Sequence, residues 1–342
     1  MYAYDIPPEY DWSLIGDSIQ NGHHRDFCYT CLEFLAVESV VTESSPRPST
    51  PALMLGCPVW GCERWRGSLY TAKAPRDEWL TQYTQAFSTV EVNSSFYALP
   101  TPEVIEGWAK KAAPGFQFCL KFPKALTHDA MLIGAESITR AFIGLMRVLK
   151  QHGRLGPAFL QLSPQFSARQ FVALARFLNA WPSDLPISVE ARHSDYFDEG
   201  ECERRFDELL TSHGMDRCLF DSRALFSAPP TDEAERESQR RKPRSPYRTT
   251  VTGSRPMVRF VGRNDLATVT PWVEEWAVTV GGWIERGLKP IVFAHSPDDA
   301  FAPEFARIID RAIRERVPSL SCLPPWPGEL ERASRKTQRS LF

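Results

Sequence analysis

Several features that mark particular classes of protein are missing from this sequence of 342 residues. It has no run of eighteen apolar residues, and its first thirty residues lack the basic start, apolar run and cleavage site of a secretory signal. Strong net charge is missing too, because 40 Lys and Arg stand against 42 Asp and Glu. We therefore expect a soluble, cytoplasmic protein that does not bind membranes and has no general attraction to nucleic acid. Without a secretory signal, the eight cysteines are expected to be reduced thiols.

The short motifs of familiar enzyme sites are also missing. The sequence contains no Gly-x-Gly-x-x-Gly, no Walker-type Gly-Lys-Ser/Thr, no His-Glu-x-x-His and no Gly-x-Ser-x-Gly. Any function therefore has to be sought in side chains that the fold brings together from distant parts of the chain.

The two ends of the chain differ from its middle. Residues 1–51 end in a Ser/Pro/Thr-rich linker and contain two pairs of zinc-ligand residue types, His23 with His24 and Cys28 with Cys31. No further ligand pair follows this His and Cys cluster at zinc-finger spacing, so we interpret the segment as a poorly ordered extension. Residues 328–342 are charged and low in apolar content, which predicts a flexible tail. The domain itself is expected to span residues 52–327.

Within the domain, short apolar runs alternate with longer amphipathic stretches, which is typical of strand–helix units and a parallel sheet. We expect eight strands, at Leu53–Cys57, Thr89–Asn93, Gln117–Phe122, Ala158–Leu162, Ile187–Ala191, Cys218–Asp221, Val258–Val261 and Ile291–His295. Helices fit at Arg76–Ala86, Pro102–Ala112, Ala135–His152, Ala168–Ala180, Cys202–His213, Thr270–Arg286 and Pro303–Arg316. This pattern predicts one α/β domain, a (β/α)8 barrel of the TIM type. Residues 228–256, a long charged connection after the sixth strand, are interpreted as a lid or binding loop.

Strand alternation predicts that polar side chains gather at the carboxyl ends of these strands. Glu91 and Asn93 alternate with Val90 and Val92, so one face of their strand is polar. By the same alternation the other barrel-facing residues are Lys121, Gln161, Glu190, Arg192, Asp221, Arg259 and His295. The loops that follow the strands add Trp60, Tyr97, His128, His193 and Arg263. Because sites in such barrels are built at this end, we expect these side chains to form one pocket.

The pocket's side chains have three chemical uses and one structural use. The basic groups predict binding of an anion, above all a phosphate; the carboxylates fit acid–base catalysis or a divalent metal; the histidines fit proton transfer. The structural alternative is a set of ion pairs filling the barrel, such as Glu91 with Arg259 and Glu190 with Lys121. Such a plug is costly, since apolar residues fill a barrel equally well.

Several runs, in order along the chain, resemble one protein family. They are Leu-Gly-Cys-Pro-Val-Trp60, Trp65-Arg-Gly-Ser-Leu-Tyr70, Glu91-Val-Asn-Ser-Ser-Phe-Tyr97, Phe118-Cys-Leu-Lys121-Phe-Pro-Lys-Ala-Leu-Thr-His128, Val189-Glu190-Ala-Arg192-His193 and Val258-Arg259-Phe-Val-Gly-Arg263. From about Leu53 to Pro325 the chain is similar to the YecE-like family, whose activity is not established. The 228–256 segment and the Ser-Leu-Phe ending resemble its YecE branch. The resemblance implies a TIM-type barrel and leaves the chemistry open.

We expect an enzyme that acts on a phosphate-bearing substrate, including a phosphodiester in nucleic acid, with catalytic roles for Glu91, Lys121, Glu190, Asp221 and His295. A divalent metal is one candidate cofactor, although metal-dependent endonuclease barrels carry more histidines at their strand ends. One alternative is a metal-free isomerase or lyase of a sugar phosphate with Lys121 as the amine. Another is a non-catalytic module that binds nucleic acid or a small anion.

The last five residues, Gln338-Arg339-Ser340-Leu341-Phe342, resemble the Gln-x-x-Leu-Phe peptide by which bacterial replication and repair proteins dock on the DNA sliding clamp. Leu341 and Phe342 would enter an apolar pocket and Gln338 would hydrogen-bond beside it. The alternative is a chance ending, or a Leu-Phe pair folded back on the protein's own surface. We therefore expect the sliding clamp as a candidate partner.

Overall fold

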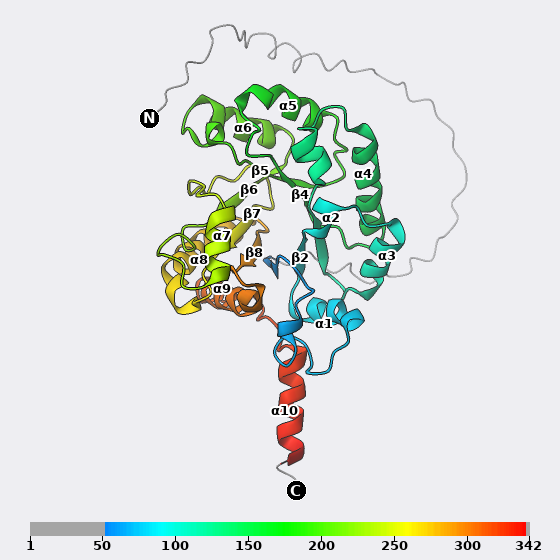
Figure 1. Ribbon diagram of the computed structural model, residues 1–342, viewed down its shortest axis with the longest axis vertical. Helices are drawn as coiled ribbons and strands as arrows, with labels where there is room; N and C mark the ends of the chain where they lie inside the picture. The colour runs from blue at the N-terminus through cyan, green and yellow to red at the C-terminus, as the bar shows by residue number, and fades with distance from the viewer. Residues whose placement is uncertain (1–51, 340–342) are drawn as a thin grey trace, which may run out of the picture. The chain divides into compact units, whose positions relative to one another are not determined.

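The computed structural model describes residues 52–339; the extension 1–51, with its histidines and cysteines, and the residues Leu341 and Phe342 lie outside the described residues. Its centre is a parallel sheet of β1 (Met54–Cys57), β2 (Thr89–Val92), β3 (Gln117–Leu120), β4 (Ala158–Gln161), β5 (Ile187–Glu190), β6 (Asp216–Asp221), β7 (Met257–Val261) and β8 (Ile291–His295). The strand order is β3-β2-β1-β8-β7-β6-β5-β4 (Figure 1). The eight predicted strands and the barrel-type order are thereby confirmed.

The two ends of the sheet meet, so the barrel is nearly closed. Phe118 pairs with Leu155, and Lys121 with Phe159, as isolated parallel bridges between the β3 and β4 segments. The backbone N–H of Phe122 also donates to the carbonyl oxygen of Phe159 at 3.0 Å. Closure brings the carboxyl ends of strands that are far apart in the sequence to one mouth.

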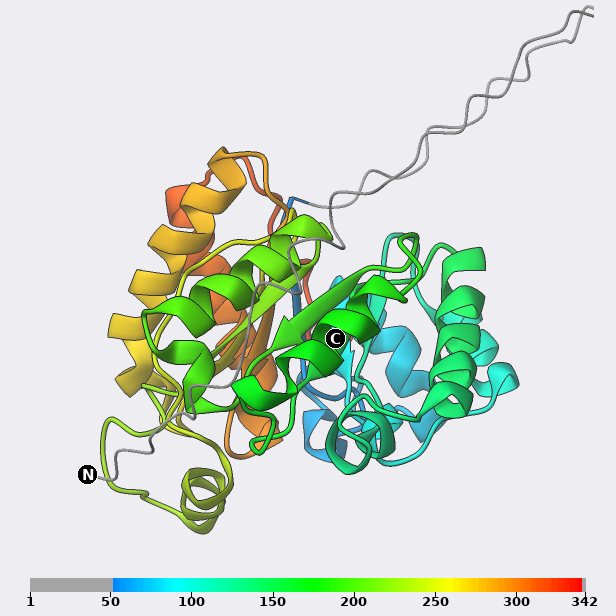
Figure 2. The same cartoon turned by 90° about the horizontal axis from the view of Figure 1, so that it is seen from above.

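Helices cover the outside of the barrel, as the view from above shows (Figure 2). Those found close to their predicted places are α1 (Trp79–Ala86), α3 (Pro102–Lys111), α4 (Glu136–Gln151), α5 (Phe171–Asn179), α6 (Glu201–Ser212), α8 (Thr270–Glu285) and α9 (Ala302–Arg316). Proline lies in the first turn of α3, α8 and α9, where its missing N–H costs no helical hydrogen bond. None of the helices in the described part of the chain is long and apolar enough to span a membrane.

The barrel interior has an apolar middle layer beneath a charged end. The middle layer is one buried cluster made of Met54, Cys119, Phe159, Cys218, Met257, Ile291 and Phe293. Below it, Arg255 donates to Oε1 of Gln117 at 2.6 Å and closes the end where the strands begin. The charged side chains at the carboxyl ends therefore lie above an apolar floor, as in a site that opens on one side only.

The predicted lid between β6 and β7 contains a helix, α7 (Glu233–Arg241). Asp232 caps it by accepting the Glu235 N–H at 2.8 Å. The buried Glu235 carboxylate accepts from Arg263 at 2.6 Å and from the Asn264 N–H at 3.1 Å. Since Arg263 and Asn264 follow β7, these contacts hold α7 at the mouth side of the barrel.

The segment expected to be a flexible tail begins instead with a helix, α10 (Pro327–Arg339), the red helix of Figure 1. Glu329 accepts from Arg307 of α9 at 2.7 Å, and the Arg307 guanidinium lies 3.4 Å from the ring centroid of the buried Trp326. A side chain at Gly328 would come within 2.3 Å of the Ser68 carbonyl oxygen, so glycine permits this close approach. Sequence reasoning missed these anchors because charged residues dominate the segment.

Candidate functional site

The centre of the site is one arginine shared by two carboxylates. Arg259 on β7 donates Nε and Nη2 to Glu91 on β2, at 2.7 and 2.8 Å. It donates Nη1 to Oε2 of Glu190 on β5 at 2.8 Å. Glu91 and Glu190 are each 1% exposed, so solvent does not weaken these pairs. Half of the structural alternative is therefore seen: Glu91 does pair with Arg259, whereas Glu190 pairs with arginine and not with Lys121.

Further side chains add hydrogen bonds to the two carboxylates, among them Cys218 on β6, whose Sγ donates to Oε2 of Glu190 at 3.7 Å. Arg192 pairs with Oε1 of Glu190, and Gln161 on β4 donates to the same oxygen at 2.8 Å. His295 on β8 lies with Nε2 3.2 Å from Oε2 of Glu91. These contacts bring residues from six strands, and Arg192 just after β5, to a single mouth.

The ionisation states follow from burial and from the neighbouring charges. Burial opposes ionisation of both carboxyl groups, but Arg259 and His295 hold the pKa of Glu91 well below its usual range. Arg192 and Arg259 likewise outweigh burial and lower the pKa of Glu190 to about 2. Burial lowers the pKa of His295 to about 4 in spite of Glu91. At neutral pH both glutamates are charged, and a neutral His295 donates its Nε2–H to Glu91.

Lys121, at the end of β3, is a cation without an acid partner. Its Nζ lies 4.2 Å from the ring centroid of Phe96 and 5.5 Å from that of Phe159, and no residue between 52 and 339 gives it an ion pair or hydrogen bond. The residue is 8% exposed. Burial, then the charge of Arg259, lowers the pKa of Lys121 to about 8. An amine in such surroundings is partly unprotonated near neutral pH and can act as a nucleophile.

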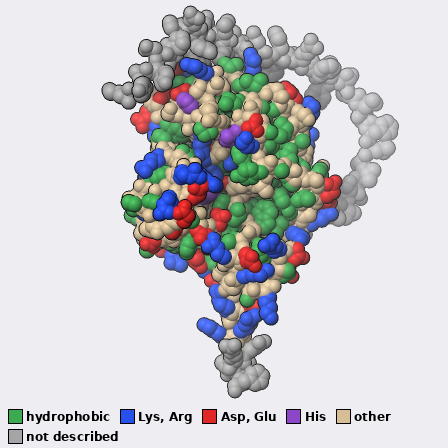
Figure 3. All heavy atoms as spheres, in the orientation of Figure 1, with side chains coloured by type: hydrophobic (Ala, Val, Ile, Leu, Met, Phe, Trp, Pro, Cys, Tyr) green, Lys and Arg blue, Asp and Glu red, His purple; other side chains and the backbone are tan. Residues whose placement is uncertain are grey.

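Lys242, which directly follows α7, is a second cation of this kind and was not predicted. It lies close enough to the mouth for its charge to help lower the pKa of His295. Burial and the charge of Arg259 lower the pKa of Lys242 itself to about 8. Within the described residues its ammonium group makes no ion pair. On the face shown in Figure 3, Lys and Arg side chains gather over α7 beside a hollow. We use the name mouth cluster for Glu91, Lys121, Glu190, Arg192, Lys242, Arg259 and His295.

Asp221 and Arg263 were expected in the pocket and lie elsewhere. The paired neighbour of Asp221 on β7 is Phe260, which faces the helices, and Asp221 accepts from Nε1 of Trp276 in α8 at 2.8 Å. Arg223 neutralises it at 2.9 Å. Arg263 binds Glu235 of α7 at 2.6 Å, so it anchors the lid and is not a free anion-binding group.

The remaining predicted residues lie around the mouth with differing roles. Asn93 donates to the Pro58 carbonyl oxygen at 3.1 Å, so it ties the loops after β2 and β1 together. His193 accepts the Asp195 N–H at 3.2 Å and caps the short helix Ser194–Phe197. The side chains of Asn93 and His193 are therefore both used in hydrogen bonds within the loops.

The predicted aromatic and histidine residues after β1, β2 and β3 differ in their contacts: some pack against helices and others lie near the mouth of the barrel. Trp60 packs edge-on against Trp108 of α3, with ring centroids 5.0 Å apart. Tyr97, at the end of α2 (Ser94–Tyr97), is 81% exposed. His128 packs against Phe96 at 5.1 Å, and Phe96 in turn contacts Lys121. Tyr97 packs against the same ring, with centroids 5.2 Å apart, so Tyr97 and His128 both reach the mouth cluster through Phe96.

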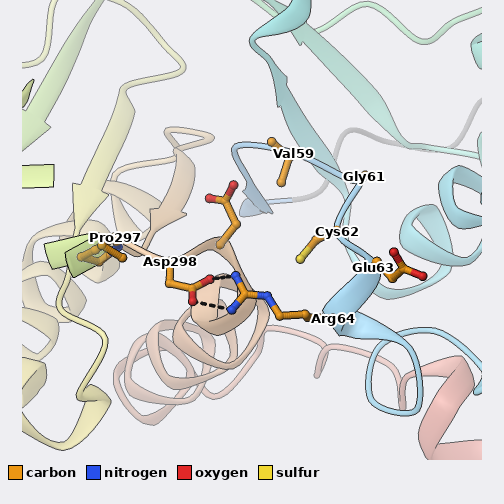
Figure 4. A pocket seen from close by; sticks show the side chains of 9 residues that line it. Val59, Gly61, Cys62, Glu63, Arg64, Pro297 and Asp298 are labelled. Carbon is orange, nitrogen blue, oxygen red and sulfur yellow. Dashed lines mark hydrogen bonds and ion pairs between the residues drawn. The ribbon is translucent and has the colours of Figure 1, made fainter. Parts of the chain in front are cut away.

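A cavity of about 480 Å³ lies beside the mouth cluster, between the loops after β1 and β8 and the start of α7. Figure 4 shows Cys62 and the Arg64–Asp298 ion pair at its wall. Burial raises the pKa of the Cys62 thiol, so this cysteine is not an activated nucleophile. Asp299 also lines the cavity, and the charge of Lys242 acts on its pKa, which connects the cavity to the mouth. Its volume suits a small organic molecule.

The side chains at the mouth do not fit a divalent metal. The expected set of three carboxylates does not converge, because Asp221 points to the helices. Arg259 occupies the place between Glu91 and Glu190 that a bridging cation would take. In the stretch from residue 52 to residue 339, no group of three His, Cys, Asp or Glu residues is arranged to hold a metal ion.

Comparison with known proteins gives one consistent family. The sequence profile described as "Protein of unknown function DUF72" matches residues 54–329. The chain is 32% identical to UPF0759 protein YecE of Escherichia coli K12 over 277 residues, which is 81% of this chain and 98% of that protein.

Solved structures agree on the fold. A DUF72 family protein from Enterococcus faecalis V583 matches with a TM-score of 0.58 at 18% identity, over 79% of this chain and 98% of that one. A DUF72 family protein from Thermotoga maritima MSB8 matches with a TM-score of 0.57 at 18% identity, over 78% of this chain and 99% of that one. At these identities the two structures are informative about the barrel and not about its chemistry.

Proposed function

The chain belongs to the YecE-like DUF72 family, whose members are proteins of unknown function, and we propose that it binds a phosphate-bearing substrate at the mouth of its barrel and acts on it there. The observation that carries this proposal is the surplus of positive charge in the mouth cluster. Its four Lys and Arg residues face two glutamates, 4 − 2 = +2 with His295 neutral. Counting Asp299 at the edge still leaves 4 − 3 = +1.

The surplus of positive charge lies inside the mouth and is not spread over the solvent-exposed surface. Lys121 and Lys242 lack a carboxylate partner in residues 52–339, and burial is the main cause of their lowered pKa values of about 8. An ammonium group that loses water without gaining a partner is unfavourable. A doubly charged phosphate would supply both the missing charge and the acceptor oxygens. Its binding would stabilise the folded protein.

The two glutamates are better suited to holding Arg259 than to acting as acids or bases. A general acid at neutral pH needs a raised pKa, whereas those of Glu91 and Glu190 are lowered. These lowered pKa values argue against the hypothesis that two carboxylates hydrolyse a phosphodiester here. The unpaired amine of Lys121 favours the isomerase or lyase alternative, in which a sugar phosphate or related molecule reacts without a metal. The cavity lined by Cys62 and Asp299 would receive the part of the substrate that carries no phosphate.

Thermal shift measurements test the proposal. A ligand at about one hundred times its Kd stabilises the folded state by about 2.7 kcal/mol. We expect phosphomonoesters and inorganic phosphate to raise the Tm of the wild-type protein above that in sodium chloride of equal ionic strength. The doubly substituted Lys121→Met/Lys242→Met protein should lose this rise.

The matched control is Lys110→Met/Lys124→Met, which removes two exposed lysines that pair with Glu106 and Asp129 at 2.7 Å. This protein should respond as the wild type does. An equal rise in the wild type and the Lys121/Lys242 double variant would contradict the proposal. A rise with oligonucleotides and none with phosphomonoesters would point to the nucleic-acid alternative.

A further inference from the structure

The substrate class can be narrowed from the position of one amine. We infer that the substrate is a phosphorylated aldehyde or ketone and that Lys121 forms an imine with its carbonyl carbon. This rests on the proposed function, because the cations of the mouth have to bind the phosphate. Arg192 and Lys242 would then bind the phosphate while the amine of Lys121 reacts.

Lys121 is held in place more firmly than an ordinary surface lysine. Its backbone N–H donates to the Val92 carbonyl oxygen at 3.1 Å, and its own carbonyl oxygen accepts from Oγ of Ser95 at 2.7 Å. The side chain lies against Phe96 and Phe159, with no carboxylate at its Nζ among the described residues. Lys110, Lys124 and Lys150, in contrast, are exposed and each pairs with an acid at 2.7 Å. A buried, positioned and unpaired amine is the arrangement that nucleophilic catalysis by lysine requires.

The protonation state agrees with this use. With a pKa of about 8 instead of 10.5, the unprotonated fraction of Lys121 at pH 7 is higher than that of an ordinary lysine by roughly two orders of magnitude. Glu91 and Glu190 favour the charged form but do not outweigh burial and Arg259. The free amine is thus available without a general base in direct contact with it.

The covalent step balances with the groups present. The lone pair of Nζ adds to the carbonyl carbon, the C–N bond forms and the C=O π electrons move to oxygen. The nitrogen then loses a proton and the alkoxide oxygen gains one, which gives the carbinolamine. The carbinolamine oxygen takes up a second proton and leaves as water while the nitrogen lone pair forms the C=N bond. Loss of the last N–H proton gives the imine, so no oxidant or reductant is needed.

We assign the proton transfer to His128, which packs on the same Phe96 ring as Lys121. The Thr127 hydroxyl donates to the Pro123 carbonyl oxygen at 3.1 Å and therefore accepts from Nδ1–H of His128 at 2.8 Å. This leaves Nε2 of the neutral imidazole with a lone pair. Burial, then the charge of Lys121, lowers the pKa of His128, which keeps the ring neutral at physiological pH.

Reductive trapping tests the inference on the full-length wild-type protein. The probe is pyridoxal 5′-phosphate, an aldehyde that carries a phosphate, followed by sodium borohydride, which reduces any imine to a stable secondary amine. Peptide mass mapping should place the label on Lys121, and inorganic phosphate should slow labelling at least tenfold. Lys121→Arg, which keeps the charge, should abolish the phosphate-protected label, whereas Lys124→Arg should not change it.

The outcomes separate the inference from the proposed function. Phosphate-protected labelling at Lys242, with Lys121 unlabelled, would overturn the imine at Lys121 and leave phosphate binding standing. Equal labelling by pyridoxal, which has no phosphate, without protection by inorganic phosphate would overturn phosphate binding itself. Because the label is mapped in the wild-type protein, misfolding of the Lys121→Arg variant would not decide the result.

Discussion

Replacing Arg259 by methionine should destabilise the protein strongly. The substitution removes three hydrogen bonds to two carboxylates that are each 1% exposed. Among residues 52–339, Glu91 would keep His295 as a partner, and Glu190 would keep Arg192, Gln161 and the weak donor Cys218. Removing one partner of a buried ion pair costs about 3–5 kcal/mol, because it leaves a charge without compensation. We expect a loss of about 4 kcal/mol in the free energy of unfolding at pH 8.

The loss should shrink as the pH falls. In the wild type the pKa of each glutamate is lowered, so the stability that its pairing contributes is complete above the unfolded value near 4.5 and disappears only as the pH falls through the folded value, about 2 for Glu190. In the variant, burial is no longer opposed by Arg259, and the folded pKa of Glu91 rises above 4.5. The variant therefore gains stability relative to the wild type as the pH falls from 8 toward the unfolded value near 4.5.

Urea unfolding followed by the fluorescence of the ten tryptophans measures these differences. The control is Arg64→Met, which breaks the Arg64–Asp298 pair; the Arg64 side chain is 63% exposed, and such pairs contribute about 0–1 kcal/mol. Adding Glu91→Gln and Glu190→Gln to Arg259→Met should recover most of the loss. A loss below about 1 kcal/mol with no dependence on pH would refute the argument that Arg259 neutralises two buried charges.

Three other predictions concern sulfate binding, Asp221 and the last ten residues. Sulfate keeps a constant charge between pH 7 and 9.5, and it should bind less tightly as the pH rises through about 8, because Lys121 and Lys242 lose their protons there. Calorimetry from pH 7 to 9.5 should show this decline in affinity. The Lys121→Arg/Lys242→Arg protein should not show it. Asp221→Asn should lower the free energy of unfolding by about 1–3 kcal/mol by weakening a charged hydrogen bond network, yet leave sulfate affinity unchanged. We also propose that a peptide of the last ten residues binds the DNA sliding clamp, measured by fluorescence polarisation; unchanged binding after Leu341→Ala and Phe342→Ala would contradict this.

The strands could be predicted because each one is a short apolar run between turns. β8 has the predicted bounds Ile291–His295, and β6 begins at Asp216, two residues before the predicted Cys218. Strand parity also placed Glu91, Lys121, Glu190 and Arg259 on the inner face. The barrel and much of its charged mouth were thus accessible from local pattern alone.

Strand alternation gave the wrong face for Asp221, because the polar member of an alternating pair of residues is not always the one that faces the site. The inner residue of β6 is Phe220, whose ring lies 4.4 Å from the Arg192 guanidinium. The partners that let Asp221 face outward include Trp276, 55 residues later in the sequence. No local pattern contains that information.

The lid was recognised as a segment, but its helix and its lysine were not. Glu233–Arg241 has almost no apolar residue, so no helical periodicity appears. The run Asp232-Glu-Ala-Glu235 was the available signal, since an acid that caps a helix is often followed three residues later by Glu. Lys242 lies outside any strand, so parity arguments could not have assigned it to the mouth.

The most direct test of the central claim is a crystal structure of the protein soaked with tungstate, a phosphate-like anion located by its anomalous scattering. The account predicts a tungstate in the mouth of the barrel, in contact with Arg192 and Lys242 and near Lys121, and its loss in crystals of Lys242→Met. Tungstate found only on the outer surface, with the mouth unchanged, would contradict the claim that the mouth cluster binds phosphate.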